Sequence, residues 1–385
     1  MDNRVFLARC GDYDRESVGL AVRRILDGLG GIASFNIKGK KVLIKANLLS
    51  PYPPERAVTT HPAVVAALAR EFIAAGGTVT IADSPGGGYS EGVLKKLYKA
   101  SGMTGAAEIT GAALSYDTGS KTVSYPEAIR CKKFDIIDPV LDADFVISAA
   151  KLKTHGLVYY TGAVKNLFGS VPGFGKAAMH SKYFDRLEFC EMLCDVCDYI
   201  KPGLSIIDGV DGMEGNGPSG GSVKHVGALG GSLNPYALDL AMCSVVSLPA
   251  KRVPTLVTGM KKGYIPGEIS SLSMLGDDYR EFLTQFIPAA GGDGKNAALS
   301  FVKNFVSSKI FKRKSSQSGM PYPEMLDNCI ACKKCAEICP RQVITVADGK
   351  ASPELSGCIR CYCCHEICPV QAIALTKKRK TPSVK

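Results

Sequence analysis

Short apolar runs alternate with amphipathic segments along most of the chain. Runs rich in β-branched residues predict buried strands, and segments with helical periodicity that end at glycine pairs predict helices. The expected strands are residues 5–10, 41–47, 78–83, 144–152 and 204–210. The expected helices are residues 18–29, 61–75, 185–200 and 235–248, with another after the glycine loop 84–88. This alternation predicts an α/β fold, a mostly parallel sheet with helices on both faces.

The composition changes after this α/β pattern. Residues 1–288 are expected to form the body, and a chain of 385 residues is long enough to bury a large core there. Residues 289–320 combine a glycine-rich linker with an amphipathic basic helix, which is expected to pack on the body. Residues 321–376 are rich in cysteine and form a second, small domain, and residues 377–385 are a basic tail.

Two cysteine motifs of identical spacing lie in the second domain. Each has three cysteines two residues apart, then a fourth after three more residues, followed by proline. In bacterial two-cluster ferredoxins, which residues 321–376 resemble, the fourth cysteine ligates the cluster of the other motif. The first [4Fe–4S] cluster is expected on Cys329, Cys332, Cys335 and Cys368, and the second on Cys358, Cys361, Cys364 and Cys339. Cys363 is left over, as a packing residue or a near-surface thiol.

Zinc or disulfides are the alternatives for these cysteines. Tetrahedral zinc takes four ligands, which leaves the third Cys-x2-Cys step and the Cys-Pro ending unexplained. Disulfides suit small secreted domains, whereas this sequence has fifteen cysteines and starts without a hydrophobic signal core. No apolar stretch reaches the roughly 18 residues of a transmembrane helix. A cytoplasmic protein without a transmembrane segment is therefore expected.

The net charge of +11 limits the classes of binding partner that are expected. A basic balance suits an acidic substrate, an acidic protein or nucleic acid. Nucleic acid is not expected, because no RNP motif, zinc finger or long arginine tract occurs. The expected partners are a redox protein that gives or takes electrons and an anionic small molecule. The oligomeric state is left open, a homo-oligomer included.

Charged and glycine residues follow four of the predicted strands. Ligands of open α/β sheets bind outside the carboxyl ends of the strands, and lysines beside glycine-rich turns are typical of anion sites. The candidate binding residues are Lys45, Asn47, Gly86, Gly87, Lys151, Thr154, Asn166, Asp208 and Glu214, with the two carboxylates on the rim. His155 is the expected general acid, because histidine titrates near neutral pH. Lys153 and Lys165 are the other catalytic candidates.

An acidic glycine-rich loop, residues 208–221, has two interpretations. Asp208, Asp211 and Glu214 could supply oxygen ligands to Mg²⁺ or Ca²⁺, so a divalent cation is a candidate further cofactor beside the anion. The same carboxylates could instead pair with the lysines that follow the strands. The sequence leaves both interpretations open.

A third cysteine group has the spacing of radical-SAM enzymes. It consists of Cys190, Cys194 and Cys197. These cysteines lie inside a predicted helix, whereas a radical-SAM cluster needs a loop on which three thiolates converge. Packing in the core is therefore expected.

Four motifs together carry a family resemblance. They are LIKANLL, KLKTHGLVYYTGAVKNLFG, DGMEGNGP and NPYALD. Over about residues 3–255 the chain resembles domain-of-unknown-function family 362, an uncharacterised group of iron–sulfur centre proteins. Several members also carry a two-cluster ferredoxin module at the C-terminus. The resemblance implies the architecture and names no reaction.

Three functions fit these features. The favoured hypothesis is a ferredoxin-coupled oxidoreductase that passes low-potential electrons to an anionic substrate or cofactor in the body. The first alternative is an electron carrier or assembly subunit for another enzyme. The second alternative is a non-redox enzyme with structural clusters.

Overall fold

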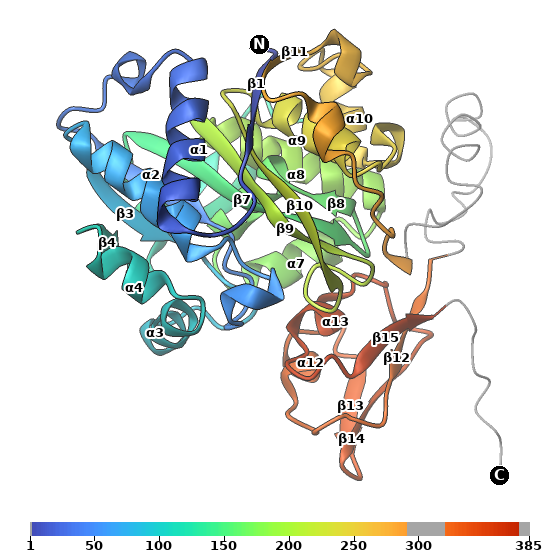
Figure 1. The fold of residues 1–385 in the computed structure, drawn as a ribbon. Helices are drawn as coiled ribbons and strands as arrows, with labels where there is room; N and C mark the ends of the chain where they lie inside the picture. The colour runs from blue at the N-terminus through green and yellow to red at the C-terminus, as the bar shows by residue number, and fades with distance from the viewer. Residues whose placement is uncertain (1, 291–319, 377–385) are drawn as a thin grey trace.

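The computed structural model describes residues 2–290 and 320–376, which form a large body and a smaller module beneath it (Figure 1). The expected linker helix and the basic tail 377–385 lie outside the described residues. Within the described part, no helix has the length and apolarity needed to span a membrane.

A nine-stranded sheet runs through the body in the order β11-β1-β10-β9-β7-β2-β3-β4, and β8 pairs with β7. Among the described strands, β10 runs against both neighbours and β8 against β7, while the other pairs are parallel. The mostly parallel α/β fold is therefore confirmed. The strands are β1 (Arg4–Arg9), β2 (Lys41–Ala46), β3 (Thr78–Ala82), β4 (Ala113–Leu114), β7 (Phe145–His155), β8 (Tyr159–Thr161), β9 (Leu204–Glu214), β10 (Ser222–Ser232) and β11 (Ser273–Gly276).

Helices cover both faces of this sheet (Figure 1). One face carries α1 (Arg15–Gly28), α2 (Pro62–Ala74), α3 (Glu91–Ala100) and α4 (Met103–Glu108). The other carries α5 (Asp138–Leu141), α6 (Ala163–Asn166), α7 (Gly175–Lys182), α8 (Arg186–Ile200), α9 (Pro235–Val245) and α10 (Pro254–Lys261), with the hairpin β5 (Ser120–Ser124) and β6 (Lys133–Ile137). Short 3-10 turns are η1 (Ile32–Phe35), η2 (Pro54–Arg56), η3 (Leu167–Ser170), η4 (Ala250–Arg252), η5 (Ile269–Ser271) and η6 (Tyr279–Phe282).

Alternation along the strands explains why both faces are covered. In β1, Val5 and Leu7 join the core under α9, while Phe6 and Ala8 join the core under α1. Both faces of a mostly parallel sheet are therefore apolar and buried. The α8 cysteines belong to the same apolar packing, since Cys190, Cys194 and Cys197 are at most 2% exposed, and the packing interpretation is confirmed.

The module consists of two antiparallel strand pairs and two short helices. The pairs are β12 (Tyr322–Met325) with β15 (Ile373–Thr376) and β13 (Ile344–Ala347) with β14 (Lys350–Pro353), and the helices are α12 (Lys334–Glu337) and α13 (Cys363–Ile367).

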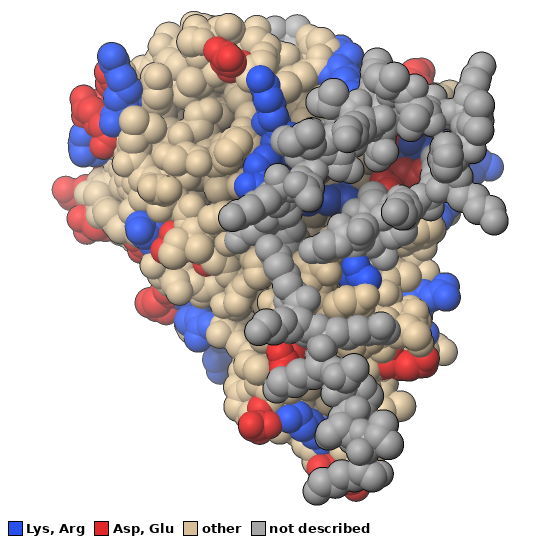
Figure 2. Space-filling view, turned by 90° about the vertical axis from the view of Figure 1, so that its right-hand side faces the viewer, with Lys and Arg blue, Asp and Glu red and all other residues tan. Residues whose placement is uncertain are grey.

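The module meets the body at the end of the sheet where β7 and β9 stop (Figure 1). The Ser219 hydroxyl donates to the Glu366 carbonyl at 3.0 Å, and the Tyr52 hydroxyl donates to the Cys368 carbonyl at 3.1 Å. A side chain at Gly156 would press on the module, because a Cβ there would lie 2.9 Å from Leu375 Cδ1. On the face shown in Figure 2, basic and acidic side chains are interspersed on body and module alike.

Candidate functional site

Eight cysteines of the module line two separate cavities. The first cavity has Cys329, Cys332, Cys335 and Cys368 in its wall, and the second has Cys339, Cys358, Cys361 and Cys364. In each cavity the fourth cysteine comes from the other motif, which is the crossing that the spacing predicts. Most of the remaining wall is apolar.

The cavities fit a polynuclear cluster better than a single ion. They measure about 340 Å³ and 380 Å³, counting the parts open to solvent, and the four thiols of each lie around this space. Within the described residues, no three His, Cys, Asp or Glu side chains converge closely enough to hold one metal ion, as a zinc site requires. Cysteines spread around such a space can hold an iron–sulfur cluster. By the same finding, the carboxylates of Asp208, Asp211 and Glu214 do not converge on one point.

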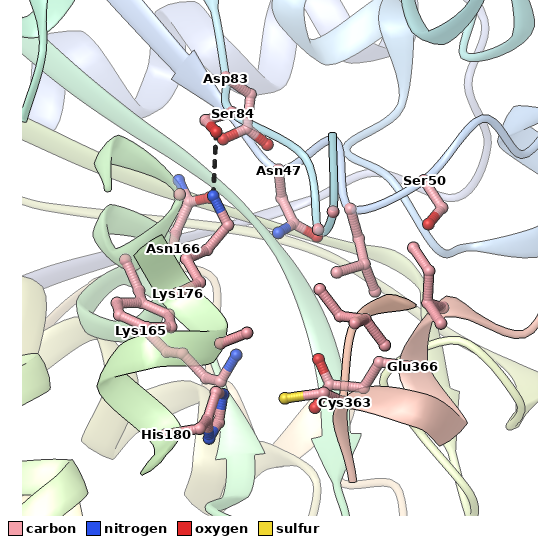
Figure 3. A pocket seen from close by; sticks show the side chains of 18 residues that line it. Asn47, Ser50, Asp83, Ser84, Lys165, Asn166, Lys176, His180, Cys363 and Glu366 are labelled. Carbon is pink, nitrogen blue, oxygen red and sulfur yellow. Dashed lines mark hydrogen bonds between the residues drawn. The ribbon is translucent and has the colours of Figure 1, made fainter. Parts of the chain in front are cut away.

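A third cavity lies between the body and the module (Figure 3). It measures about 680 Å³, counting the part open to solvent. Its body residues include Asn47, Ser50, Asp83, Ser84, Gly86, Gly87, Lys165, Asn166, Lys176 and His180, and its module residues are Ile338, Cys363, Glu366 and Ile367. The body residues follow β2 and β3 or belong to α6 and α7, so this is the crevice at the carboxyl ends of the strands. We call it the interdomain cavity.

Two buried lysines form a fixed layer in and beneath the wall of this cavity. The Lys45 ammonium lies 2.7 Å from Asp83 Oδ1 and donates to Asn166 Oδ1 at 3.1 Å. The Lys153 ammonium donates to Asn47 Oδ1 at 2.7 Å and to the Val58 carbonyl at 2.8 Å. Lys45 and Lys153 therefore hold the two asparagines that face the cavity and do not themselves line it. Burial lowers the pKa of both lysines.

Lys165 and Lys176 face the interdomain cavity directly (Figure 3). Lys165 makes no hydrogen bond or ion pair with any described residue, and burial lowers its pKa. Lys176 donates to Ser84 Oγ at 2.9 Å and to the Val171 carbonyl at 2.6 Å, and burial lowers its pKa to about 7. Lys176 is a site residue that the sequence did not select, because an isolated lysine in a glycine-rich loop suggests a solvated side chain.

The predicted general acid, His155, does not reach the cavity. Its Nδ1 accepts the Leu157 N–H at 3.0 Å, and its Nε2 lies 3.2 Å from Glu366 Oε1 of the module. Burial lowers the pKa of His155 to about 4. Although burial alone would raise the pKa of Glu366, His155 and Lys165 lower it to about 2. The assignment of His155 as general acid is therefore corrected: it anchors Glu366.

His180 is the histidine of the cavity wall instead. Its ring stacks on Phe189 at 4.1 Å between centroids, and it makes no hydrogen bond within the described part of the chain. Burial lowers the pKa of His180 to about 3. Cys363, the cysteine of the second motif that is not a predicted ligand, lies in the opposite wall, and its hydrogen bond lowers the pKa of Cys361.

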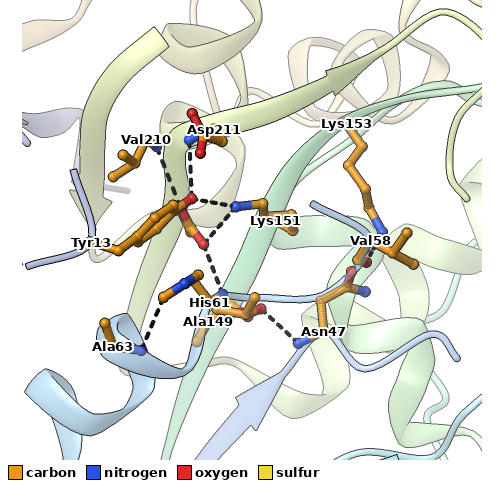
Figure 4. A network of polar contacts seen from close by, with 12 residues as sticks. Tyr13, Asn47, Val58, His61, Ala63, Ala149, Lys151, Lys153, Val210 and Asp211 are labelled. Atoms are coloured by element: carbon orange, nitrogen blue, oxygen red, sulfur yellow. Dashed lines mark hydrogen bonds and ion pairs between the residues drawn. The ribbon is translucent and has the colours of Figure 1, made fainter. Parts of the chain in front are cut away.

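Lys151 belongs to a separate buried network on the α1–α2 side (Figure 4). Its ammonium lies 2.8 Å from Asp208 Oδ2 and 2.7 Å from the Tyr13 hydroxyl. The Tyr13 ring stacks on His61 at 3.6 Å, and the His61 N–H donates to Asp208 at 2.9 Å. The Lys151 ammonium is thus compensated by a buried carboxylate and a tyrosine hydroxyl, which favours a structural role for this network.

Five predicted binding residues thus do not line the cavity, namely Lys45, which lies beneath its wall, and Lys151, Thr154, Asp208 and Glu214. The Thr154 hydroxyl donates to the Gly215 carbonyl at 2.9 Å. Glu214 accepts the Ile287 N–H at 2.8 Å and lies 3.8 Å from Lys224. The expected rim of Asp208 and Glu214 is wrong, because each carboxylate is engaged elsewhere.

The fold and the cysteine-lined cavities define an iron–sulfur protein. Residues 323–345 match the 4Fe-4S binding domain, which supports at least one [4Fe–4S] cluster and an electron-transfer role. Residues 42–244 match the domain of unknown function DUF362. A thylakoid-associated protein of Synechocystis sp. is 36% identical over 272 residues, covering 69% of this chain and 81% of that protein. The chain belongs to the DUF362 family.

A solved structure also aligns with the body. The lactate racemase apoprotein from Thermoanaerobacterium thermosaccharolyticum has 15% sequence identity and a TM-score of 0.42. The alignment covers 64% of this chain and 57% of that chain. A likeness of this size carries no conclusion about the reaction.

Proposed function

We propose that the protein is an oxidoreductase that passes low-potential electrons from its ferredoxin-like module to an anionic substrate or cofactor in the interdomain cavity. One observation carries this proposal: the cavity has lysines of the body in one wall and α13 of the module in the other. The helix α13 contains Cys364 and directly precedes Cys368, two of the eight cavity-lining thiols. A ligand in this cavity would lie beside the cysteine motifs.

In this proposal the module holds two [4Fe–4S] clusters, one in each cysteine-lined cavity. Bound clusters supply one-electron transfer. The crossed grouping of the cysteines supports two clusters, because each cavity has a full set of four thiols.

The body residues would bind and orient the ligand. Lys165 supplies a positive charge that no described residue neutralises, and Asn47 is held toward the cavity by Lys153. Lys176 is the residue suited to hold and release a proton, because its pKa of about 7 is near the working pH of an enzyme. Glu366, anchored by His155, closes the module side.

Anaerobic purification tests the proposal. The protein should contain about eight iron atoms and matching acid-labile sulfide, as two cubane clusters require. Cys339→Ala should remove about half of the iron, and Cys363→Ala should leave the iron content unchanged. Stoichiometric zinc without sulfide would refute the cluster assignment.

Electron delivery to the cavity needs its own measurement. A small anion should co-purify and be identified by mass spectrometry, and it should reoxidise dithionite-reduced clusters within the same molecule. Lys165→Met should remove the anion and the reoxidation while leaving the reduced-state EPR signal in place. Reoxidation that is unchanged in Lys165→Met would contradict the role of the cavity.

A second candidate, an electron carrier for another enzyme, is favoured by one surface feature. Cys332 is exposed in the first cysteine cavity, and Ile330 beside it is 59% exposed, so a partner could approach there. A carrier would have titratable clusters and no small molecule in the cavity, which the same mass spectrometry distinguishes.

A further inference from the structure

Counted with the layer beneath its wall, the interdomain cavity has more positive than negative groups. Two ammonium groups, those of Lys165 and Lys176, line the cavity, and two more, those of Lys45 and Lys153, lie beneath its wall, whereas the carboxylates that line it are those of Asp83 and Glu366. Asp83 is already paired with Lys45. No carboxylate of the described residues lies within ion-pair distance of Lys165 or Lys176.

We propose that the ligand of this cavity is a small dianion, seated between Lys165 and Lys176, that carries either two carboxylates or one phosphoryl group. This inference rests on the proposed function only in taking the interdomain cavity as the ligand site. Nothing in it depends on the direction or partner of electron transfer.

The two lysines approach the cavity from different positions (Figure 3). Lys176 comes from α7 and is held beside Ser84, at the loop that follows β3. Lys165 comes from α6 and points toward the His180 and Glu366 end. A monoanion could neutralise one of these ammonium groups, whereas a dianion can pair with both.

Donors with free N–H groups surround this space. Lys176 uses two of its three N–H groups on Ser84 and Val171, so one is left. The Asn47 amide nitrogen and His180, which is 5% exposed, make no hydrogen bond with described residues. Such a set suits the several acceptor lone pairs of carboxylate or phosphate oxygens. A neutral apolar ligand would leave these donors without hydrogen-bond partners.

Binding of a dianion should take up protons. Lys176 faces Asp83, Lys45 and Lys165, besides the Ser84 hydroxyl and the Val171 carbonyl, and its pKa in the empty cavity is about 7. An anion favours the charged amine and raises its pKa. Affinity should therefore fall as the pH rises above about 7, and Lys176→Met should remove this dependence.

Calorimetric titration of the full-length, anaerobically loaded, oxidised protein tests the inference. The probes are succinate and inorganic phosphate as dianions and acetate as the monoanion. Either dianion should bind at least about tenfold more tightly than acetate, and Lys165→Met and Lys176→Met should each weaken it about 10- to 100-fold. Lys182→Met, an exposed lysine on the same helix α7, is the matched control and should bind like the wild type.

The measured affinities distinguish the two kinds of dianion. Preference for succinate assigns two carboxylates, and preference for phosphate assigns one phosphoryl group. Equal binding of acetate, unchanged binding in Lys165→Met, or no binding of either dianion at millimolar concentration would overturn it. Lys165→Gln, checked by thermal melting, guards against a folding defect. Because no electron donor is present, a failure of electron delivery would leave this result unaffected.

Discussion

Lys151 and Lys165 lie at the same edge of the sheet and differ in burial and in their partners. Lys151 contacts Asp208 at 2.8 Å and the Tyr13 hydroxyl at 2.7 Å, so its charge is compensated within the body (Figure 4). Lys165 has no partner among the described residues and faces a cavity (Figure 3). Lys151 is thus compensated by the fold, whereas Lys165 is the lysine for which the proposed ligand would supply the partner.

The largest effect on stability is expected from replacing Asp208, the carboxylate that pairs with Lys151. Asp208→Ala leaves the Lys151 ammonium buried without its carboxylate, which should lower the free energy of unfolding by about 3–5 kcal/mol. Denaturant titration measures this change. The double variant Asp208→Ala, Lys151→Met should regain part of the loss, because no unpaired charge is left. A loss below about 1 kcal/mol in the single variant would remove the contrast between the two lysines.

A smaller effect is expected on the pH dependence of stability, through His61 of the network around Lys151. Burial lowers the pKa of His61 from 6.5 to about 4, so between these values the unfolded chain binds more protons than the folded one. The contribution of His61 is therefore complete above pH 6.5 and is lost as the pH falls toward 4. His155 and His180 act in the same direction.

His61→Asn isolates this contribution, because asparagine can still accept the Ala63 N–H at the start of α2. The slope of unfolding free energy against pH between 4 and 6.5 should decrease by up to about 1.4 kcal/mol per pH unit, the value for one proton. Denaturant titrations at several pH values measure it. An unchanged slope would mean that His61 is protonated in the folded protein.

The smallest effect on stability is expected from replacing Lys165, which faces the interdomain cavity. Lys165→Met removes a charge that has no partner and keeps a side chain of similar length, so the ligand-free protein should change in stability by less than about 1 kcal/mol. Thermal melting without added anion measures this. A loss as large as that of Asp208→Ala would show that Lys165 has a structural role.

Much of the site could be predicted from the rule that ligands bind outside the carboxyl ends of parallel strands. It selected Asn47, Gly86, Gly87, Lys165 and Asn166, which line the interdomain cavity, because each follows or borders a strand end. The cysteine spacing likewise predicted which thiols share each cavity of the module, because it is the spacing of two-cluster ferredoxins, in which the fourth cysteine of each motif belongs to the other set.

The failures have physical reasons. Lys151 and Lys153 are two residues apart, so regular alternation would place them on one face, but a register shift in the pairing of β7 with β9 separates their environments. His180 and His155 stand in one segment, and only the packing of α7 on Phe189 shows which histidine faces the cavity. Glu366 could not be found, because sequence does not show how the module sits on the body.

The hydrogen-bonded layer of Lys45, Asn166, Lys153 and Asn47 has a further consequence. These groups are oriented before any ligand enters, and three of them are almost fully buried. When the charge of a bound molecule changes by one electron, water in its place would have to turn, whereas this layer is already aligned. In the proposed function, this alignment would lower the reorganisation energy of such a step and therefore its activation barrier.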